Sequence, residues 1–158
     1  MNNQRVALRL PRMTAPSREH LIDAFWVFSV QNHKLKESER LHQINTGLPA
    51  ELALATKATF NLADEHLELL FNASLTTLKR LQHQHKLLSY VASERLHRIA
   101  FMCQQAVVVF ESREGVTRWM SAPNASFGHS TPLLLCMTDI GGHQVRRVLH
   151  ALEWGGTV

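Results

Sequence analysis

Glycine is absent from the first 46 residues of this 158-residue chain, which holds seven glycines and five prolines in all. Because glycine and proline mark turns and helix ends, the few that occur are informative about boundaries. The sequence contains no HExxH pair, no glycine-rich phosphate loop and no serine elbow, which are motifs that identify many enzymes. We therefore predict no enzyme activity and no cofactor.

The chain has only two cysteines, Cys103 and Cys136, which are too few for a metal framework. Both lie among apolar residues, as buried thiols do, although a single disulfide between them is an alternative. The ten histidines predict no metal site either, because His83 and His85 would diverge by about 200° on a helix. No apolar run approaches the ~18 residues that cross a bilayer, and no secretory leader begins the chain. These absences predict a cytoplasmic protein that binds no metal and is not attached to a membrane.

Acidic residues are scarce in the middle of the chain, where residues 74–100 hold five Lys or Arg against one Glu. Residues 1–46 hold seven against four, whereas residues 111–158 are balanced at four each. The formal net charge of +4 is too small for a chain that coats nucleic acid, so its local distribution matters more than its total. The excess lies at the N-terminus and in the middle.

Apolar residues recur at helical spacing along the chain, and no segment has the alternating pattern of a β-strand. This periodicity predicts an all-α fold. Ser17 and Ser89 are expected to cap helices, and the run Ala106–Phe110 favours a helix end over a strand. The expected elements are an arm over 1–16, helices over 18–31 and 34–45, further helices between Gly47 and Phe110, a helix over 114–121, a loop over 122–130, a short helix opened by Thr131-Pro132, and a last helix stopped by Gly155-Gly156.

The segment Leu67-Glu-Leu-Leu-Phe-Asn-Ala-Ser-Leu-Thr-Thr-Leu-Lys-Arg-Leu81 has the spacing of a helix-turn-helix. Asn72 suits a left-handed residue in the turn, and Ser74 can cap the second helix. Leucines take the inward side of that helix, so the other side chains would face a DNA groove. A plain helical hairpin with a solvated basic face is the alternative. The predicted DNA-binding residues are Ser74, Thr76, Thr77, Lys79, Arg80, His83 and Lys86.

Near the C-terminus, Trp119 and Met120 precede a loop rich in turn-forming residues around Phe127. Trp and Met are enriched in the cores of protein interfaces, and proline and glycine hold a loop in one shape before binding. This loop and the tail 153–158 are predicted to face a protein partner. The alternative is that Trp119 and Leu133 pack in the core of the chain itself.

The stretch Asn72-Ala-Ser-Leu-Thr-Thr-Leu-Lys-Arg-Leu81 resembles the glycine-x-serine-x-arginine-threonine-leucine-x-arginine core of the Xre-like antitoxins found beside RES-type toxins. Residues 88–100 resemble the next signature of that family, a serine before a helix that carries two arginines. The chain also departs from the pattern, because Thr76 replaces the family's arginine, Asn72 its turn glycine, and Ala63 the serine that caps the preceding helix. The family's best base-reading arginine is therefore missing here.

Residues further along resemble, in order, the toxin-binding domain shared by the Xre, MbcA and ParS antitoxins. The matching positions are Trp119, Pro123-Asn124, Phe127-Gly128, Pro132-Leu133, Thr138 to Gly141, and Glu153-Trp-Gly155. The resemblance covers about residues 47–158. It implies three parts, which are an N-terminal arm and helical dimerisation segment over 1–46, an Xre-like helix-turn-helix domain over 47–110, and a small helical toxin-binding domain over 111–158.

The resemblance implies a type II antitoxin that binds a RES-type toxin, covers the cleft in which the toxin destroys NAD+, and represses its own operon. The implied partners are this toxin, operator DNA and a second copy of the chain, with Trp26 suited to the dimer contact. The alternative is a DNA-binding regulator whose C-terminal domain senses a ligand or only dimerises. The implied toxin-binding residues are Trp119, Met120, Asn124, Phe127, Gly128, Pro132, Leu133, Trp154 and Gly155.

Overall fold

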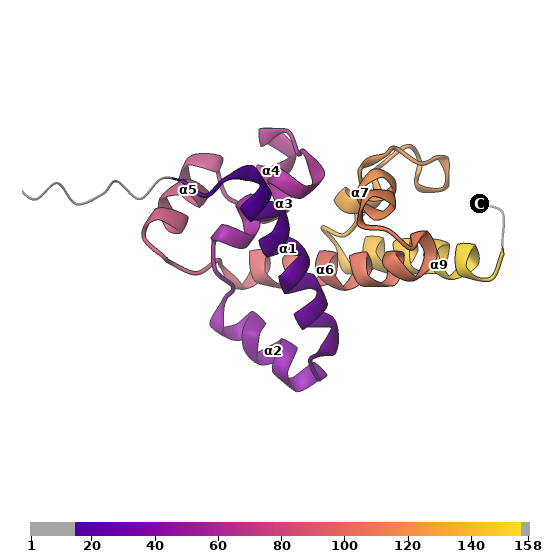
Figure 1. The fold of residues 1–158 in the computed structure, drawn as a ribbon, viewed down its shortest axis with the longest axis horizontal. Coiled ribbons are helices and arrows are strands. Elements are labelled where there is room, and N and C mark those ends of the chain that lie inside the picture. The colour runs from indigo at the N-terminus through magenta and orange to yellow at the C-terminus, as the bar shows by residue number, and fades with distance from the viewer. Residues whose placement is uncertain (1–14, 156–158) are drawn as a thin grey trace, which may run out of the picture.

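The computed structural model describes residues 15–155, and this range folds into nine α-helices and one short 3-10 helix, η1 (Figure 1). The predicted all-α fold is confirmed. Most of the predicted arm, residues 1–14, lies outside the described range, as do residues 156–158. The elements are α1 (Arg18–Lys34), α2 (Glu37–Thr46), α3 (Glu51–Phe60), α4 (Asp64–Phe71), α5 (Leu75–His83), α6 (Tyr90–Phe110), α7 (Arg113–Ser121), η1 (Ala125–Phe127), α8 (Pro132–Leu135) and α9 (Asp139–Glu153).

The 21-residue helix α6 is the axis on which the other helices assemble. Helices α1, α2 and α4 pack on it from earlier in the chain, and α7 and α9 pack on it from later (Figure 1). Its inward residues Leu96, Ile99 and Cys103 are fully buried, and they belong to one apolar core that extends from Phe25 to Leu149. No helix of residues 15–155, α6 included, has the combination of length and apolar character that spanning a bilayer requires.

Helix α1 is an internal part of this fold. Phe25 is fully buried and meets Phe60 of α3 edge to face, with the ring centroids 5.2 Å apart. Further along α1, the Ser29 hydroxyl donates a hydrogen bond of 3.1 Å to the backbone carbonyl of Ala100 in α6. Trp26 is only 2% exposed. The prediction that Trp26 contacts a second copy of the chain is therefore wrong, because its own chain already covers it.

Short-range signals in the sequence place the helix ends. The Ser17 hydroxyl accepts a hydrogen bond from the backbone N–H of His20, and the Ser89 hydroxyl accepts one from Ala92, both at 3.2 Å. Such caps satisfy N–H groups that have no partner inside the helix, and each contributes about 1 kcal/mol to stability. Gly47 ends α2 at φ 100°, a backbone angle that favours glycine.

The two alternatives left open in the apolar middle of the chain are resolved by the structure. The run 106–110 is the last part of α6, so it is helix and not strand. Cys103 and Cys136 are both free thiols in the buried core. Burial raises the pKa of the Cys136 thiol to about 12 and raises that of Cys103 as well, so both stay protonated and unreactive at neutral pH.

Candidate functional site

Helices α4 and α5 form the predicted helix-turn-helix. Asn72 ends α4 in the left-handed conformation at φ 50°, and the Ser74 hydroxyl accepts a hydrogen bond of 3.1 Å from the backbone N–H of Thr77. The Glu68 carboxylate adds a contact that sequence reasoning missed, because it accepts a 2.8 Å hydrogen bond from the N–H of Leu75 across the turn. Two side chains therefore satisfy the first N–H groups of α5 and fix its direction relative to α4.

The outer face of α5 is polar and basic. Leu78 is fully buried, and Leu75 and Leu81 pack partly buried against the core, as predicted for the inward side. Thr77 is partly buried, and its hydroxyl oxygen accepts a hydrogen bond from Ser74 Oγ, so it supports the cap of α5. The other predicted DNA-binding residues are all exposed, and they are Ser74, Thr76, Lys79, Arg80, His83 and, in the loop after α5, Lys86.

A groove beside α5 brings in basic residues from distant parts of the chain. Its volume is about 680 Å³, and Arg18 of α1 and Lys57 of α3 line it together with Lys79 and His83. Lys57 is paired with Asp64 at 2.8 Å, so Arg18 is the main addition to the charge of this surface. Sequence reasoning did not assign Arg18 because nothing local signals that the start of α1 lines the same groove as α5.

An aromatic cluster joins the end of α6 and α7 to the loop between α7 and α8. The ring of Trp119 lies 5.5 Å from Phe110 and 6.2 Å from Phe127, measured between centroids. Met120 and Leu133 are 0% and 1% exposed, so their side chains offer no area to a partner in this conformation. Both were predicted to bind the toxin directly, but in this conformation they belong to the buried apolar core, which also contains Phe127.

The loop is held in one shape by its own hydrogen bonds. The Asn124 side chain accepts a 2.9 Å hydrogen bond from the N–H of Ser126, and its backbone N–H donates to the carbonyl of Ser130 at 3.1 Å. Gly128 adopts φ 61° at the exposed tip. Pro132 is buried at the first position of α8. A loop ordered in this way loses little conformational entropy when a partner binds.

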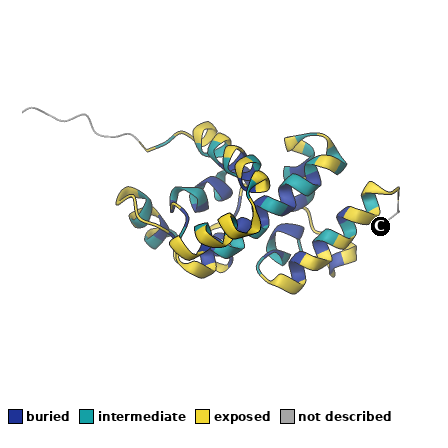
Figure 2. Cartoon of the chain, turned by 90° about the horizontal axis from the view of Figure 1, so that it is seen from below, coloured by how far each residue is buried: buried dark blue, intermediate teal, exposed yellow. Residues whose placement is uncertain are grey.

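One side of α9 is exposed along its whole length (Figure 2). This side carries large apolar side chains at both ends. Ile140 is 76% exposed and Trp154 is 80% exposed. A shallow hollow of about 200 Å³ lies between this side of α9 and Phe127 of the loop. Gly155 follows at φ 77°. We call the exposed α9 side and the loop the α9 face, and its α9 residues are Ile140, Gln144, Arg147, Ala151 and Trp154.

Sequence reasoning found one end of the α9 face and missed the other. Trp154 and Gly155 were assigned from the tail, but Ile140 was not assigned. Its spacing from Val145 and Leu149, both buried, would have shown that it points to the opposite side of the same helix.

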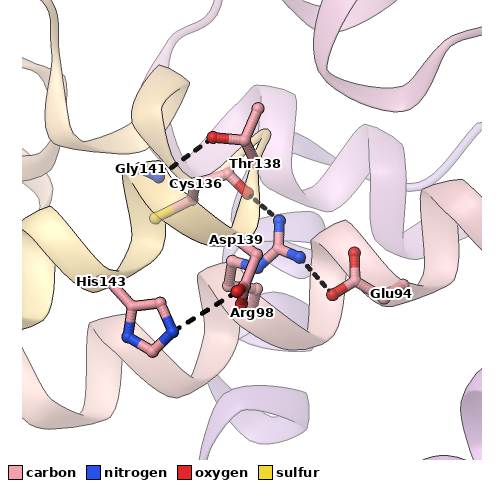
Figure 3. A network of polar contacts seen from close by, with 7 residues as sticks. All are labelled: Glu94, Arg98, Cys136, Thr138, Asp139, Gly141 and His143. Carbon is pink, nitrogen blue, oxygen red and sulfur yellow. Dashed lines mark hydrogen bonds and ion pairs between the residues drawn. The ribbon is translucent and has the colours of Figure 1, made fainter.

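Two arginines of α6, at the positions of the second resembled signature, brace the two halves of the molecule. Arg95 donates to the carbonyls of Leu69 and Leu70 at 3.1 and 3.0 Å, where α4 ends. Arg98 donates to the carbonyl of Cys136 at 2.8 Å and pairs with Glu94 (Figure 3). The guanidinium groups thus satisfy carbonyls that the ends of α4 and α8 leave without a helical partner.

The corner between α8 and α9 depends on two adjacent glycines. A Cβ atom on Gly142 would lie 2.8 Å from Cδ of Arg98, and one on Gly141 would lie 2.0 Å from the carbonyl oxygen of Leu135. The Thr138 hydroxyl caps α9 by accepting a hydrogen bond of 3.0 Å from the N–H of Gly141 (Figure 3). Arg98 can reach Cys136 only because this corner has no side chain in its way.

The histidines and cysteines considered for a metal site are not brought together. His83 and His85 are exposed near the end of α5, whereas His97 and Cys103 are buried in α6. Within residues 15–155, no three His, Cys, Asp or Glu side chains are grouped closely enough to hold a metal ion.

Comparison with protein families gives two matches that follow one another along the chain. Residues 36–100 match the model of the antitoxin Xre-like helix-turn-helix domain. Residues 105–155 match the model of the antitoxin Xre/MbcA/ParS C-terminal toxin-binding domain. A comparison with curated proteins gives no significant match. The first match contains α4 and α5, and the second contains the whole α9 face.

Proposed function

Because the chain belongs to the Xre-type antitoxins, which bind DNA and a toxin and are not enzymes, we propose that it neutralises a RES-type toxin by covering the cleft where that toxin degrades NAD+. The observation that carries this proposal is the α9 face, an exposed surface with apolar ends inside the matched toxin-binding domain. Exposed apolar patches commonly mark contacts with a protein partner, and Trp is among the side chains enriched in interface cores.

The α9 face has the parts of a protein interface. Trp154 offers a large area at low entropic cost, Ile140 a second apolar anchor, and Arg147 between them a charged donor. Phe127 lines the adjoining hollow, into which a side chain of the toxin can fit. In this arrangement Gly128 and Asn124 contact the toxin with backbone and polar groups.

The experiment is neutralisation in cells that make the toxin encoded beside this chain. The wild-type chain should restore NAD+ levels, and Trp154→Ala should weaken the complex at least tenfold, as expected for a large aromatic anchor. Leu69→Ala is the matched control, since Leu69 is an exposed apolar residue of α4 outside the toxin-binding domain. Full NAD+ recovery with Trp154→Ala and Ile140→Ala combined would place the interface elsewhere. Failure of the wild-type chain to bind the toxin at all would reject the proposed function.

The second half of the proposed function is repression of the chain's own operon. In this role α5 enters the major groove, Arg80 contacts base edges, and Lys79, Lys86 and Arg18 contact phosphates. One helix of this kind discriminates by only ~1–3 kcal/mol per contact, so two copies on a symmetric operator would be needed.

The segment that joins the two copies is proposed to lie within residues 17–46. Since Trp26 is buried, the contact would use exposed side chains such as Val27 of α1 and Leu41 of α2. Light scattering of Val27→Glu with Leu41→Glu should give the mass of a monomer, and an unchanged dimer mass would move the contact to another part of the chain.

A further inference from the structure

A hollow lined by three arginines lies between α2, α6 and α9, and Leu41, proposed above for the dimer contact, also lines it. Its volume is about 480 Å³, within the range of small-ligand sites, and α2, α6 and α9 form its walls. Arg40 comes from α2, Arg98 from α6 and Arg146 from α9. The acidic residues of the lining are Glu94, which is already paired with Arg98, and Glu37. The lining therefore keeps an excess of positive charge.

Two of these guanidinium groups are positioned by an aromatic ring and not by a carboxylate. The Arg40 and Arg146 guanidinium carbons lie 5.0 and 5.5 Å from the ring centroid of Phe101, in cation–π contact. Neither arginine forms an ion pair with any residue of 15–155, and the Nε atom of each is buried without a hydrogen-bond partner. Buried N–H donors without an acceptor are costly, and they point to a ligand that supplies one.

A buried histidine in the lining of the same hollow provides a hydrogen-bond acceptor, whereas the arginines provide donors. His97 is only 4% exposed, and its Nδ1 lies 2.5 Å from Oδ1 of Asn32. The Asn32 amide nitrogen donates to the His97 carbonyl at 3.3 Å, which identifies Oδ1 as the acceptor from Nδ1–H. The proton of the neutral ring is therefore on Nδ1, and Nε2 presents a lone pair that has no partner within the described chain.

The hollow thus offers cationic donors beside one buried acceptor. A carboxylate or a sulfate satisfies the donors alone, whereas a phosphate with one protonated oxygen satisfies both kinds of group. We propose that this hollow binds a small phosphate-bearing ligand, with its oxygens on Arg40 and Arg146 and one P–O–H proton shared with Nε2 of His97. Arg98, already paired, forms the floor of the site. The ligand would join α2 and α9, which both pack on α6.

The protonation of His97 agrees with this assignment. Burial and the nearby Arg40 lower the pKa of His97 to about 4, so the ring is neutral at pH 7. A bound phosphate brings negative charge to Nε2 and raises the pKa of His97, whether the shared proton stays on oxygen or moves to nitrogen. The groups that face this ring are Arg40 and Glu37 from α2, Glu94 and Arg98 from α6, Arg146 from α9, and Asn32 from α1.

The test uses the full-length chain and inorganic phosphate or pyrophosphate as probes, with sulfate as the comparison anion. We expect saturable shifts of the His97 ring signals in NMR, a rise in the melting temperature with probe concentration, and weaker effects from sulfate. Arg40→Gln and Arg146→Gln should each lower the affinity about tenfold, the loss expected for one charge-assisted hydrogen bond. Arg147→Gln is the matched control, because Arg147 is the neighbouring arginine on α9 and lies outside the hollow.

Three results would overturn the proposal. The first is an unshifted His97 signal in the wild-type chain at probe concentrations on the order of 10 mM, a measurement that does not depend on any variant folding. The second is loss of operator affinity in Arg146→Gln, which would show that the phosphate is that of DNA. The third is loss of toxin binding in Arg146→Gln without any phosphate binding to the wild-type chain, which would assign the hollow to a carboxylate of the toxin.

Discussion

Arg98 of α6 donates a 2.8 Å hydrogen bond to the backbone carbonyl of Cys136 and thereby ties the central helix to the corner that precedes α9. The same guanidinium pairs with Glu94 one turn earlier. The toxin-binding domain is therefore fixed to the helix-turn-helix domain by a polar contact as well as by the shared apolar core.

Removing this contact should destabilise the whole chain. Arg98→Ala leaves the Cys136 carbonyl and the Glu94 carboxylate without their donor, and we expect it to lower the free energy of unfolding by about 2 kcal/mol. Urea denaturation would measure the change. Arg147→Ala removes an exposed arginine and should alter stability by less than about 0.5 kcal/mol. Equal stability of the two variants would show that the Arg98 contact contributes nothing.

The glycine corner gives a second prediction about stability. Gly141→Ala places a Cβ atom 2.0 Å from the Leu135 carbonyl oxygen, so α8 and α9 must move apart, and we expect a loss of about 3 kcal/mol. At Gly128 nothing lies within 4 Å of an added Cβ, and only the positive φ is unfavourable, at about 1 kcal/mol. Thermal melting of both variants should place Gly141→Ala well below Gly128→Ala. The reverse order would mean that the corner adapts to a side chain.

Stability should fall as the solution is acidified through the range set by His97. In the folded chain its pKa is about 4, below the ordinary value of 6.5, so the unfolded chain binds this proton first as the pH falls. The contribution of the neutral His97 ring to the free energy of unfolding is complete above pH 6.5 and decreases between pH 6.5 and pH 4. At pH 5 the free energy of unfolding should be about 2 kcal/mol lower than at neutral pH for this reason. Unfolding free energies of the wild type and His97→Gln at pH 7 and pH 5 would isolate this contribution. Identical pH dependence in both proteins would contradict it.

DNA binding should separate base contacts from phosphate contacts. Arg80→Gln should reduce the preference for operator over unrelated DNA by about tenfold, since one bidentate contact to guanine is worth ~1–3 kcal/mol. Lys79→Gln should weaken binding to both DNAs and lower the slope of log K against log salt by ~0.9. Binding titrations at several salt concentrations give both numbers, with Arg147→Gln as the unaffected control. An unchanged salt slope in Lys79→Gln would remove Lys79 from the phosphate contacts.

The sequence predicted the features that depend on neighbours along the chain. Asn72 at the turn and the caps Ser17, Ser74 and Ser89 were located correctly, because a cap or a left-handed residue is decided within three or four positions. The inward leucines of α5 followed from helical spacing alone. The resemblance to the antitoxin domains used the same local signals and was confirmed by the family matches.

The features that the sequence did not reveal depend on contacts between distant segments. Trp26 was expected to face a partner because nothing local shows that it is buried when α1 packs on α3 and α6. Met120 and Leu133 are residue types found in protein interfaces, but both are buried in the core of the chain itself. The hollow joins Arg40 to Arg146 across more than a hundred positions, a distance over which no pattern of spacing operates.

The single rod formed by α6 has a consequence for regulation at the operator. At about 1.5 Å per residue it is roughly 30 Å long, and it passes without a break from the DNA-reading half to the half that carries the α9 face. A toxin bound to the α9 face would therefore have a fixed orientation around the DNA duplex. One extra residue in α6 would rotate the bound toxin by about 100° relative to the DNA-binding half. If several toxin-bound antitoxins occupy adjacent operator sites, the rotation fixed by α6 would decide whether they fit side by side. Flexibility between the two halves of the chain would not decide it.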